Sequence, residues 1–215
     1  KGSVLSESTR TRAQKLSEPK QDDASKKSQY VIVLDAGHGG KDEGAVSDDG
    51  KLEEKEYNLA VVKEIARLLE QSGVKVYCTR TTDRTVSKKA RVRLANKRQA
   101  DMLVSVHCNA SDARKHSVRG IEVLYSKRDN GAGYTNKQLA AKLLKKTVAA
   151  TGLPARGVIR REDLYLMHHA KVPAVIVETG YLTNPSDCLY MRQEKGIRQT
   201  AWGIYQAVME TLEKY

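Results

Sequence analysis

Hydrophobic residues in this chain fall into short apolar runs that alternate with longer amphipathic stretches. Short apolar runs bounded by turn-forming or polar residues are typical of buried strands. Such runs predict strands at residues 30–35, 74–79, 102–107, 120–126 and 174–178. Strands that alternate with helices indicate a single α/β domain, with a mostly parallel central sheet flanked by helices on both faces.

Apolar residues at helical spacing occupy the segments between these runs. This spacing predicts helices at residues 56–71 and 197–208, and a short helix that opens at Pro185. Ser87 can cap a helix that runs to about residue 99 with a basic outer face. Thr135 and Gln138 match a capping box, and Gly152 is a suitable end for that helix. Residues 156–167 show no regular pattern, so we expect irregular chain with short extended pieces.

Three of the predicted strands end in a side chain that can carry chemistry. The strand at residues 30–35 runs into a glycine-rich turn that holds His38. The strand at residues 102–107 ends at His107, and the strand at residues 174–178 ends at Glu178. The carboxyl ends of parallel strands meet at one edge of the sheet, where open α/β folds place their ligands. A phosphate-binding loop is disfavoured, because Asp35 and Asp42 stand where a Walker loop needs Gly and Ser or Thr.

Two histidines and one carboxylate would suit a zinc ion and leave a fourth position open. His38 and His107 are the candidate imidazoles, while the carboxylate could come from Glu53, Glu54 or Glu56. Alternation along the strand turns Cys108 away from the side that His107 faces, so Cys108 is expected to pack in the core.

Other polar residues near the predicted sheet have less direct roles. Glu178 ends a buried strand, where a carboxylate is costly unless it is paired or functional, and it could act as a general base. His168 and His169 are adjacent, and adjacent residues rarely share one metal, so we expect them at the surface or at the edge of a substrate site.

Composition narrows the class of partner. The chain has 215 residues with 38 Lys and Arg against 26 Asp and Glu, a net charge of +12 that favours an acidic partner. Nucleic acid is disfavoured because aromatic residues do not interleave with the basic ones. Three widely spaced cysteines argue against a disulfide framework, and no apolar run is long enough for a transmembrane helix. Residues 1–29 are polar and indicate a flexible linker or tail, whereas residues 30–215 form the predicted domain.

Four motifs together are more specific than any one of them. In chain order they are LDAGHGGKDEGA, LEEKEYNLA, ADMLVSVHCNAS and VPAVIVETGYLTNPSD. This series resembles the zinc-dependent N-acetylmuramoyl-L-alanine amidases, bacterial cell-wall hydrolases that include cell-separation and spore-cortex types. The resemblance covers residues 30–215. It implies one zinc ion per chain held by His38, Glu54 and His107, with Glu178 as the catalytic glutamate; the family's glutamate precedes a lysine, which selects Glu54.

The resemblance also implies a substrate and a place of action. We expect hydrolysis of the amide between N-acetylmuramic acid and L-alanine in peptidoglycan, with other anionic wall polymers as further partners. The protein would be a monomer, extracellular or periplasmic at the cell wall, with its leader outside this chain. Substrate contacts are expected at Asn109 and at His168, where many members carry Arg. Residues 109–135 look too short for the inhibitory helix of some members, so the site should be unoccluded.

Two other functions fit the same residues. The chain could be a non-catalytic wall-binding module that retains a structural metal. It could also be a zinc peptidase that cuts within the stem peptide, because the ligand set alone does not define the bond that is cleaved.

Overall fold

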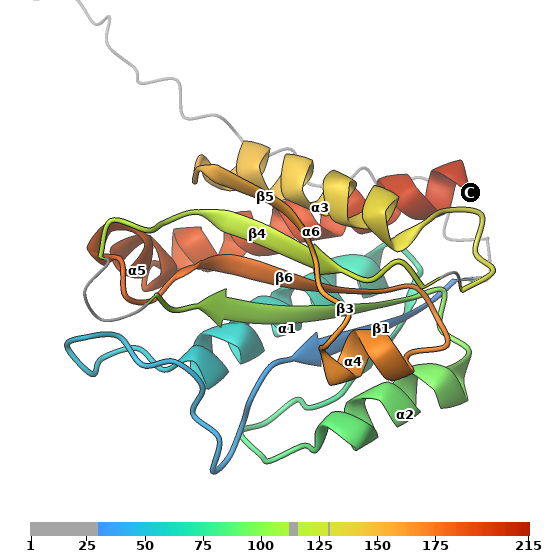
Figure 1. The fold of residues 1–215 in the computed structure, drawn as a ribbon, viewed down its shortest axis with the longest axis horizontal. Helices are drawn as coiled ribbons and strands as arrows, with labels where there is room; N and C mark the ends of the chain where they lie inside the picture. Colours follow the sequence, from blue (N-terminus) through green and yellow to red (C-terminus); the bar gives the residue numbers. More distant parts are fainter. Residues whose placement is uncertain (1–29, 112–115, 129) are drawn as a thin grey trace, which may run out of the picture.

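The computed structural model describes residues 30–111, 116–128 and 130–215, so the predicted linker at residues 1–29 lies outside the described residues. Within the described part, one sheet of six strands forms the centre of the molecule (Figure 1). The strands are β1 (Val31–Ala36), β2 (Lys75–Cys78), β3 (Met102–Asn109), β4 (Ile121–Tyr125), β5 (Ala155–Arg160) and β6 (Ala174–Tyr181). Their order is β2-β1-β3-β6-β4-β5, and all neighbours are parallel except β4 and β6. The predicted α/β fold with a mostly parallel sheet is confirmed.

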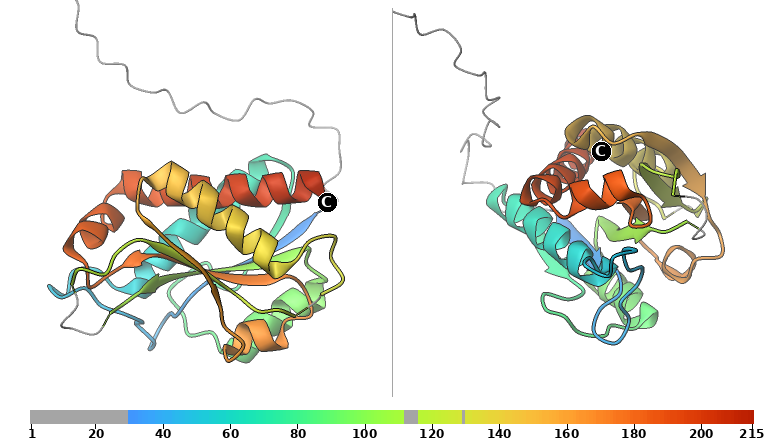
Figure 2. Two further views of the ribbon diagram at one scale, coloured as in Figure 1. Left: turned by 45° about the horizontal axis from the view of Figure 1, so that its top comes forward. Right: turned by 90° about the vertical axis from the view of Figure 1, so that its left-hand side faces the viewer.

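Helices cover both faces of this sheet, as Figure 2 shows most clearly in its left view. They are α1 (Glu54–Gln71), α2 (Lys88–Arg98), α3 (Asn136–Thr151), α4 (Tyr165–His169), α5 (Pro185–Met191) and α6 (Glu194–Lys214). Helices α1, α3 and α6 pack on one face, and α2 and α4 pack on the other. Among the described helices, none combines the length and the apolar character that a membrane crossing requires.

Helix ends follow the local signals in the sequence. The Thr135 side chain accepts a hydrogen bond from the Gln138 backbone amide, and Gln138 completes a capping box at the start of α3. That helix ends at Gly152 in the left-handed conformation, with φ of 73°. Ser87 caps α2 through the Ala90 amide, so this predicted start is also confirmed.

Two segments differ from the sequence-based expectation. Helix α1 begins at Glu54 rather than at residue 56, so its first turn includes the acidic residues of that stretch. Residues 156–167 are more regular than predicted, because they contain most of β5 and the start of α4. β5 is ordered by its parallel pairing with β4, and α4 by Leu166 and Met167, which are buried against the sheet.

Strand side chains divide between the two faces with the usual period of two. In β1 and β3, Leu34 and Val104 enter the core beneath α1, α3 and α6, whereas Val33 and Leu103 enter the core beneath α2 and α4. The same alternation buries Cys108 in the first core, as predicted. At the carboxyl ends of the strands, residues that lie next to these core positions, such as His107 beside Cys108, therefore face the side of the sheet that α2 covers.

Candidate metal centre

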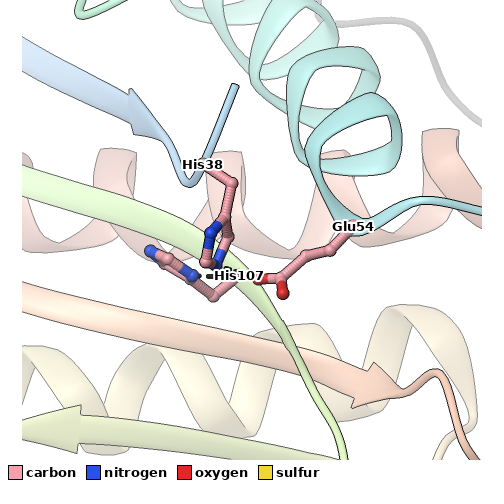
Figure 3. Close-up of side chains that lie close together, drawn as sticks. All are labelled: His38, Glu54 and His107. Atoms are coloured by element: carbon pink, nitrogen blue, oxygen red, sulfur yellow. Dashed lines mark hydrogen bonds and ion pairs between the residues drawn. The ribbon is translucent and has the colours of Figure 1, made fainter. Parts of the chain in front are cut away.

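Three side chains from distant parts of the chain meet at the carboxyl edge of the sheet (Figure 3). His38 follows β1, Glu54 begins α1 and His107 lies near the end of β3. One potential ligand atom from each lies within 4.8 Å of the other two. The Glu54 Oε1 atom is 2.9 Å from His107 Nδ1 and 3.2 Å from His38 Nε2. The structure thus brings together the three residues that the resemblance assigns to zinc.

Glu54 is fixed by donors from three parts of the chain. The backbone amides of Ala45 and Cys108 each donate to its carboxylate at 2.9 Å, and Asn58 Nδ2 donates at 3.2 Å. Burial alone would raise the pKa of Glu54, but hydrogen bonds and charge from His107 and His38 hold the pKa well below its usual range. The carboxylate is therefore an anion aimed between the two rings.

The neighbouring glutamates face elsewhere. The Glu53 carboxylate pairs with Lys55 Nζ at 3.1 Å, and Glu56 is exposed on α1. Of the three carboxylates that the sequence left open, Glu54 is the one that contacts both histidines. The start of α1 at Glu54 accounts for this, because the first helical turn points this side chain at the end of β3.

His38 is held in an unusual backbone conformation. Its φ is 58°, which few non-glycine residues adopt, and its Nδ1 lies 2.8 Å from Asp42 Oδ1. A carboxylate on the second ring nitrogen orients a metal-binding histidine and leaves Nε2 for the ion. Burial lowers the pKa of His38, but the Glu54 and Asp42 carboxylates outweigh burial and raise it to about 9. Burial also lowers the pKa of His107, and the nearby carboxylates again raise it above its usual value.

Two glycines let bare backbone approach the ligands. A Cβ atom on Gly37 would lie 2.3 Å from the His107 ring. A Cβ atom on Gly44 would lie 2.6 Å from Glu54 Oε2 and 2.7 Å from the His38 ring. Any larger residue at either position would therefore displace one of the candidate ligands.

Two arginines hold the loop that carries His38. Arg91 donates to the carbonyl of His38 at 2.7 Å, to that of Ala36 at 2.6 Å and to the Asp35 carboxylate at 2.6 Å. Arg80 donates to the carbonyl of Gly37 at 2.8 Å. Neither residue was identified from the sequence. The sequence predicts that the basic residues of this helix lie on its outer face, but Arg91 is only 6% exposed. The available signal was that Asp35 ends a predicted strand of apolar residues, where a buried carboxylate needs a partner.

Glu178 lies beside the three ligands and faces the same side of the sheet. It is paired with His107 in the β3–β6 ladder. Among the described residues, its buried Oε2 atom has no hydrogen-bond partner. Burial, followed by the negative charges of Glu54 and Glu122, outweighs the two histidines and raises the pKa of Glu178 to about 7. A carboxyl group with this pKa can both accept and release a proton near neutral pH.

The two predicted substrate contacts lie in different places. Asn109 ends β3 near the ligands, and its Nδ2 donates to Tyr181 Oη at 3.1 Å and to Glu122 at 3.3 Å. His168 is exposed on α4, where its carbonyl accepts a hydrogen bond from Arg128. Arg128 follows the far end of β4, and because β4 is antiparallel to β6, this end lies away from Glu178. The position of His168 therefore lends no support to its predicted substrate role.

Two imidazole nitrogens, one carboxylate oxygen and an adjacent base form a donor set that fits a catalytic zinc ion. Comparison with known proteins points the same way: the family described as N-acetylmuramoyl-L-alanine amidase matches residues 32–210. The chain belongs to this amidase family.

Relatives within the amidase family differ in overall length. The chain is 36% identical over 163 residues to the N-acetylmuramoyl-L-alanine amidase LytC of Bacillus subtilis, covering 76% of this chain and 32% of LytC. It is 36% identical over 187 residues to the probable cell wall amidase LytH of Staphylococcus aureus, covering 86% of this chain and 58% of LytH. The chain thus spans about a third of one relative and over half of the other.

Solved amidase structures share the fold. The catalytic domain of CwlV from Bacillus (Paenibacillus) polymyxa var. colistinus superimposes with a TM-score of 0.78 at 34% identity, covering 86% of this chain and 98% of CwlV. An N-acetylmuramoyl-L-alanine amidase from Clostridium difficile 630 gives a TM-score of 0.80 at 34% identity, covering 87% of this chain and 98% of that chain. The described residues therefore share their fold with almost the whole of both solved chains.

Proposed function

We propose that this chain is a zinc-dependent N-acetylmuramoyl-L-alanine amidase, which hydrolyses the amide between N-acetylmuramic acid and the L-alanine of the stem peptide. The observation that carries the proposal is the convergence of His38, Glu54 and His107, with Glu178 aligned beside them. Family membership supports the choice of bond, since LytC and CwlV are described as N-acetylmuramoyl-L-alanine amidases.

The proposed roles follow from where each group lies. His38, Glu54 and His107 would hold the zinc ion. When bound, zinc supplies positive charge that makes a neighbouring water more acidic and polarises a carbonyl oxygen. Glu178 takes a proton from the attacking water as the water oxygen bonds to the carbonyl carbon. The same carboxyl group then gives that proton to the alanine nitrogen when the C–N bond breaks.

Burial and charge suit Glu178 to this exchange. Its unbonded Oε2 is free to accept a proton, and its pKa of about 7 lets it return that proton at neutral pH. Asn109 extends the edge next to the ligands, so we propose that it contacts substrate there. We place the protein at the cell wall, in an extracellular or periplasmic location, with peptidoglycan as its partner; LytH is likewise described as a probable cell wall amidase.

Digestion of purified peptidoglycan tests the proposal. We expect intact stem peptides with a free N-terminal L-alanine, identified by mass spectrometry. A chelator should abolish the reaction and added zinc should restore it. New amino termini inside the stem peptide would instead establish the peptidase alternative. Sacculus binding without any released fragment, in zinc-loaded protein, would establish the non-catalytic binding module.

A further inference from the structure

Helix α2 presents a row of cations to solvent. Lys89, Arg93 and Lys97 are all exposed, and we call these three residues the basic stripe. They are spaced four apart, so they lie along one side of the helix. The opposite side, with Val92 and Ala95, packs on the sheet.

The charge of the basic stripe is not compensated nearby. Helix α2 contains no Asp or Glu. Some basic residues elsewhere do have acidic partners, such as Lys146 with Glu210 and Arg156 with Glu122. Within the described residues, no ion pair is found for a member of the stripe. A cationic surface without a local counter-charge attracts an external anion.

The spacing of the stripe favours a polymer over a compact anion. A rise of about 1.5 Å per residue sets successive members roughly 6 Å apart along the helix, so three charges span about 12 Å. A single phosphate can contact two neighbouring members, whereas a chain with repeated phosphates can contact all three. No aromatic residue lies in α2, so base stacking, which single-stranded nucleic acids require, is not provided by this helix.

We propose that the basic stripe binds phosphodiester-linked anionic polymers of the cell wall. The inference rests on the proposed function insofar as that function places the chain at the wall. Arg91, on the same helix, holds the carbonyl of His38 at 2.7 Å, so α2 is joined directly to the loop of the metal centre. A polymer held along α2 would therefore keep the reactive edge of the sheet close to the wall, and raise the local concentration of peptidoglycan.

Two triple variants of the full, zinc-loaded chain test the stripe. The first carries Lys89→Gln, Arg93→Gln and Lys97→Gln. The second carries Lys63→Gln, Lys137→Gln and Lys145→Gln, which removes the same charge from exposed positions on α1 and α3, on the other face of the sheet. Binding is measured by co-sedimentation with Gram-positive walls, before and after acid removal of their phosphate polymers, over a range of salt concentrations.

We expect the wild-type chain to bind untreated walls more tightly than stripped walls, with affinity that falls as salt rises. Because the stripe variant loses three cations that face the anionic polymer, it should bind untreated walls at least about tenfold more weakly. The control variant should change binding less than about twofold. Both variants should digest soluble, polymer-free peptidoglycan fragments as the wild type does.

Several results would overturn the proposal. Equal losses in the two triple variants would mean that only net charge matters. Equal binding to stripped and untreated walls would show that phosphate polymers are not the ligand, and tighter binding to anionic lipid vesicles would favour a membrane. Because sedimentation needs no turnover, a chain that binds through the stripe but releases no stem peptide would contradict the amidase proposal alone.

Discussion

At the scale of single residues, Glu178 and His38 show how the fold sets proton chemistry. Glu178 is a carboxyl group with one buried, unbonded oxygen and a pKa raised to about 7 by burial and by neighbouring carboxylates. His38 is the reverse case, because carboxylates on both ring nitrogens stabilise its protonated form. One group is poised to move a proton, and the other must lose a proton before it can bind metal.

Replacing Glu178 should separate catalysis from metal binding. In Glu178→Gln we expect kcat to fall by roughly 10²–10⁴-fold, since general-base catalysis is worth about that much. Zinc content, measured by atomic absorption, should be unchanged. Glu56→Gln is a matched control on an exposed glutamate and should retain full activity. Loss of zinc from Glu178→Gln would instead make Glu178 a ligand.

Zinc affinity should rise with pH because of His38. In the metal-free protein its pKa is raised to about 9, so at neutral pH a proton occupies the ring that zinc needs. We expect affinity to increase by up to about tenfold per pH unit between pH 7 and 9, measured by competition with a chromophoric chelator. Asp42→Asn removes one carboxylate and should move this rise to lower pH. An affinity independent of pH over this range would refute the assignment.

At the scale of elements, the inner and outer sides of α2 differ in what they contact. Its inner side sends Arg91 to Asp35 and to the backbone after β1, where Thr79 and Ser105 also donate to the Asp35 carboxylate at 2.6 Å. Its outer side is solvated. Because Asp35 is fully buried, the inner arginine neutralises a charge that would otherwise destabilise the fold.

Two substitutions on this one helix should therefore differ sharply. Arg91→Gln leaves the Asp35 carboxylate buried without its cation, and should lower the free energy of unfolding by about 3–5 kcal/mol. Arg93→Gln removes the same charge from an exposed position and should change it by less than about 0.5 kcal/mol. Urea denaturation followed by circular dichroism measures both. Similar values for the two variants would contradict the buried-pair argument.

At the scale of the whole molecule, zinc would join β1, α1 and β3 through their side chains. A ligand that binds only the folded state stabilises it by about 2.7 kcal/mol at 100 times its Kd. Adding zinc to the metal-free protein should therefore raise Tm by several degrees in a thermal scan. His107→Ala should fold and show almost no increase. An equal increase in that variant would place the stabilising zinc elsewhere.

The overall architecture was largely predictable because its signals are local. Apolar runs such as that of β3 and caps such as Thr135 are read from neighbouring residues. β5 was less visible because it is an edge strand with mostly exposed residues, and α4 is only five residues long. Their order comes from contacts with distant segments, which a local pattern does not contain.

The site was predictable in part for the same reason. His38 and His107 follow strong strand signals, whereas the choice of Glu54 among its neighbours depended on the family resemblance until the start of α1 was known. Arg80 and Arg91 were missed because arginine is usually a surface residue, and the carbonyl groups that they bind lie far away in sequence.

The pairing of Glu178 with His107 in the β3–β6 ladder restricts how this part of the chain can change in length. Deleting one residue between Ala174 and Glu178 would bring Thr179 opposite His107, whereas adding one would bring Val177 there, and either change would turn the Glu178 carboxylate to the other face of the sheet. In related proteins, insertions or deletions of an odd number of residues within β6 should therefore be avoided, and length changes should be confined to the loops on either side.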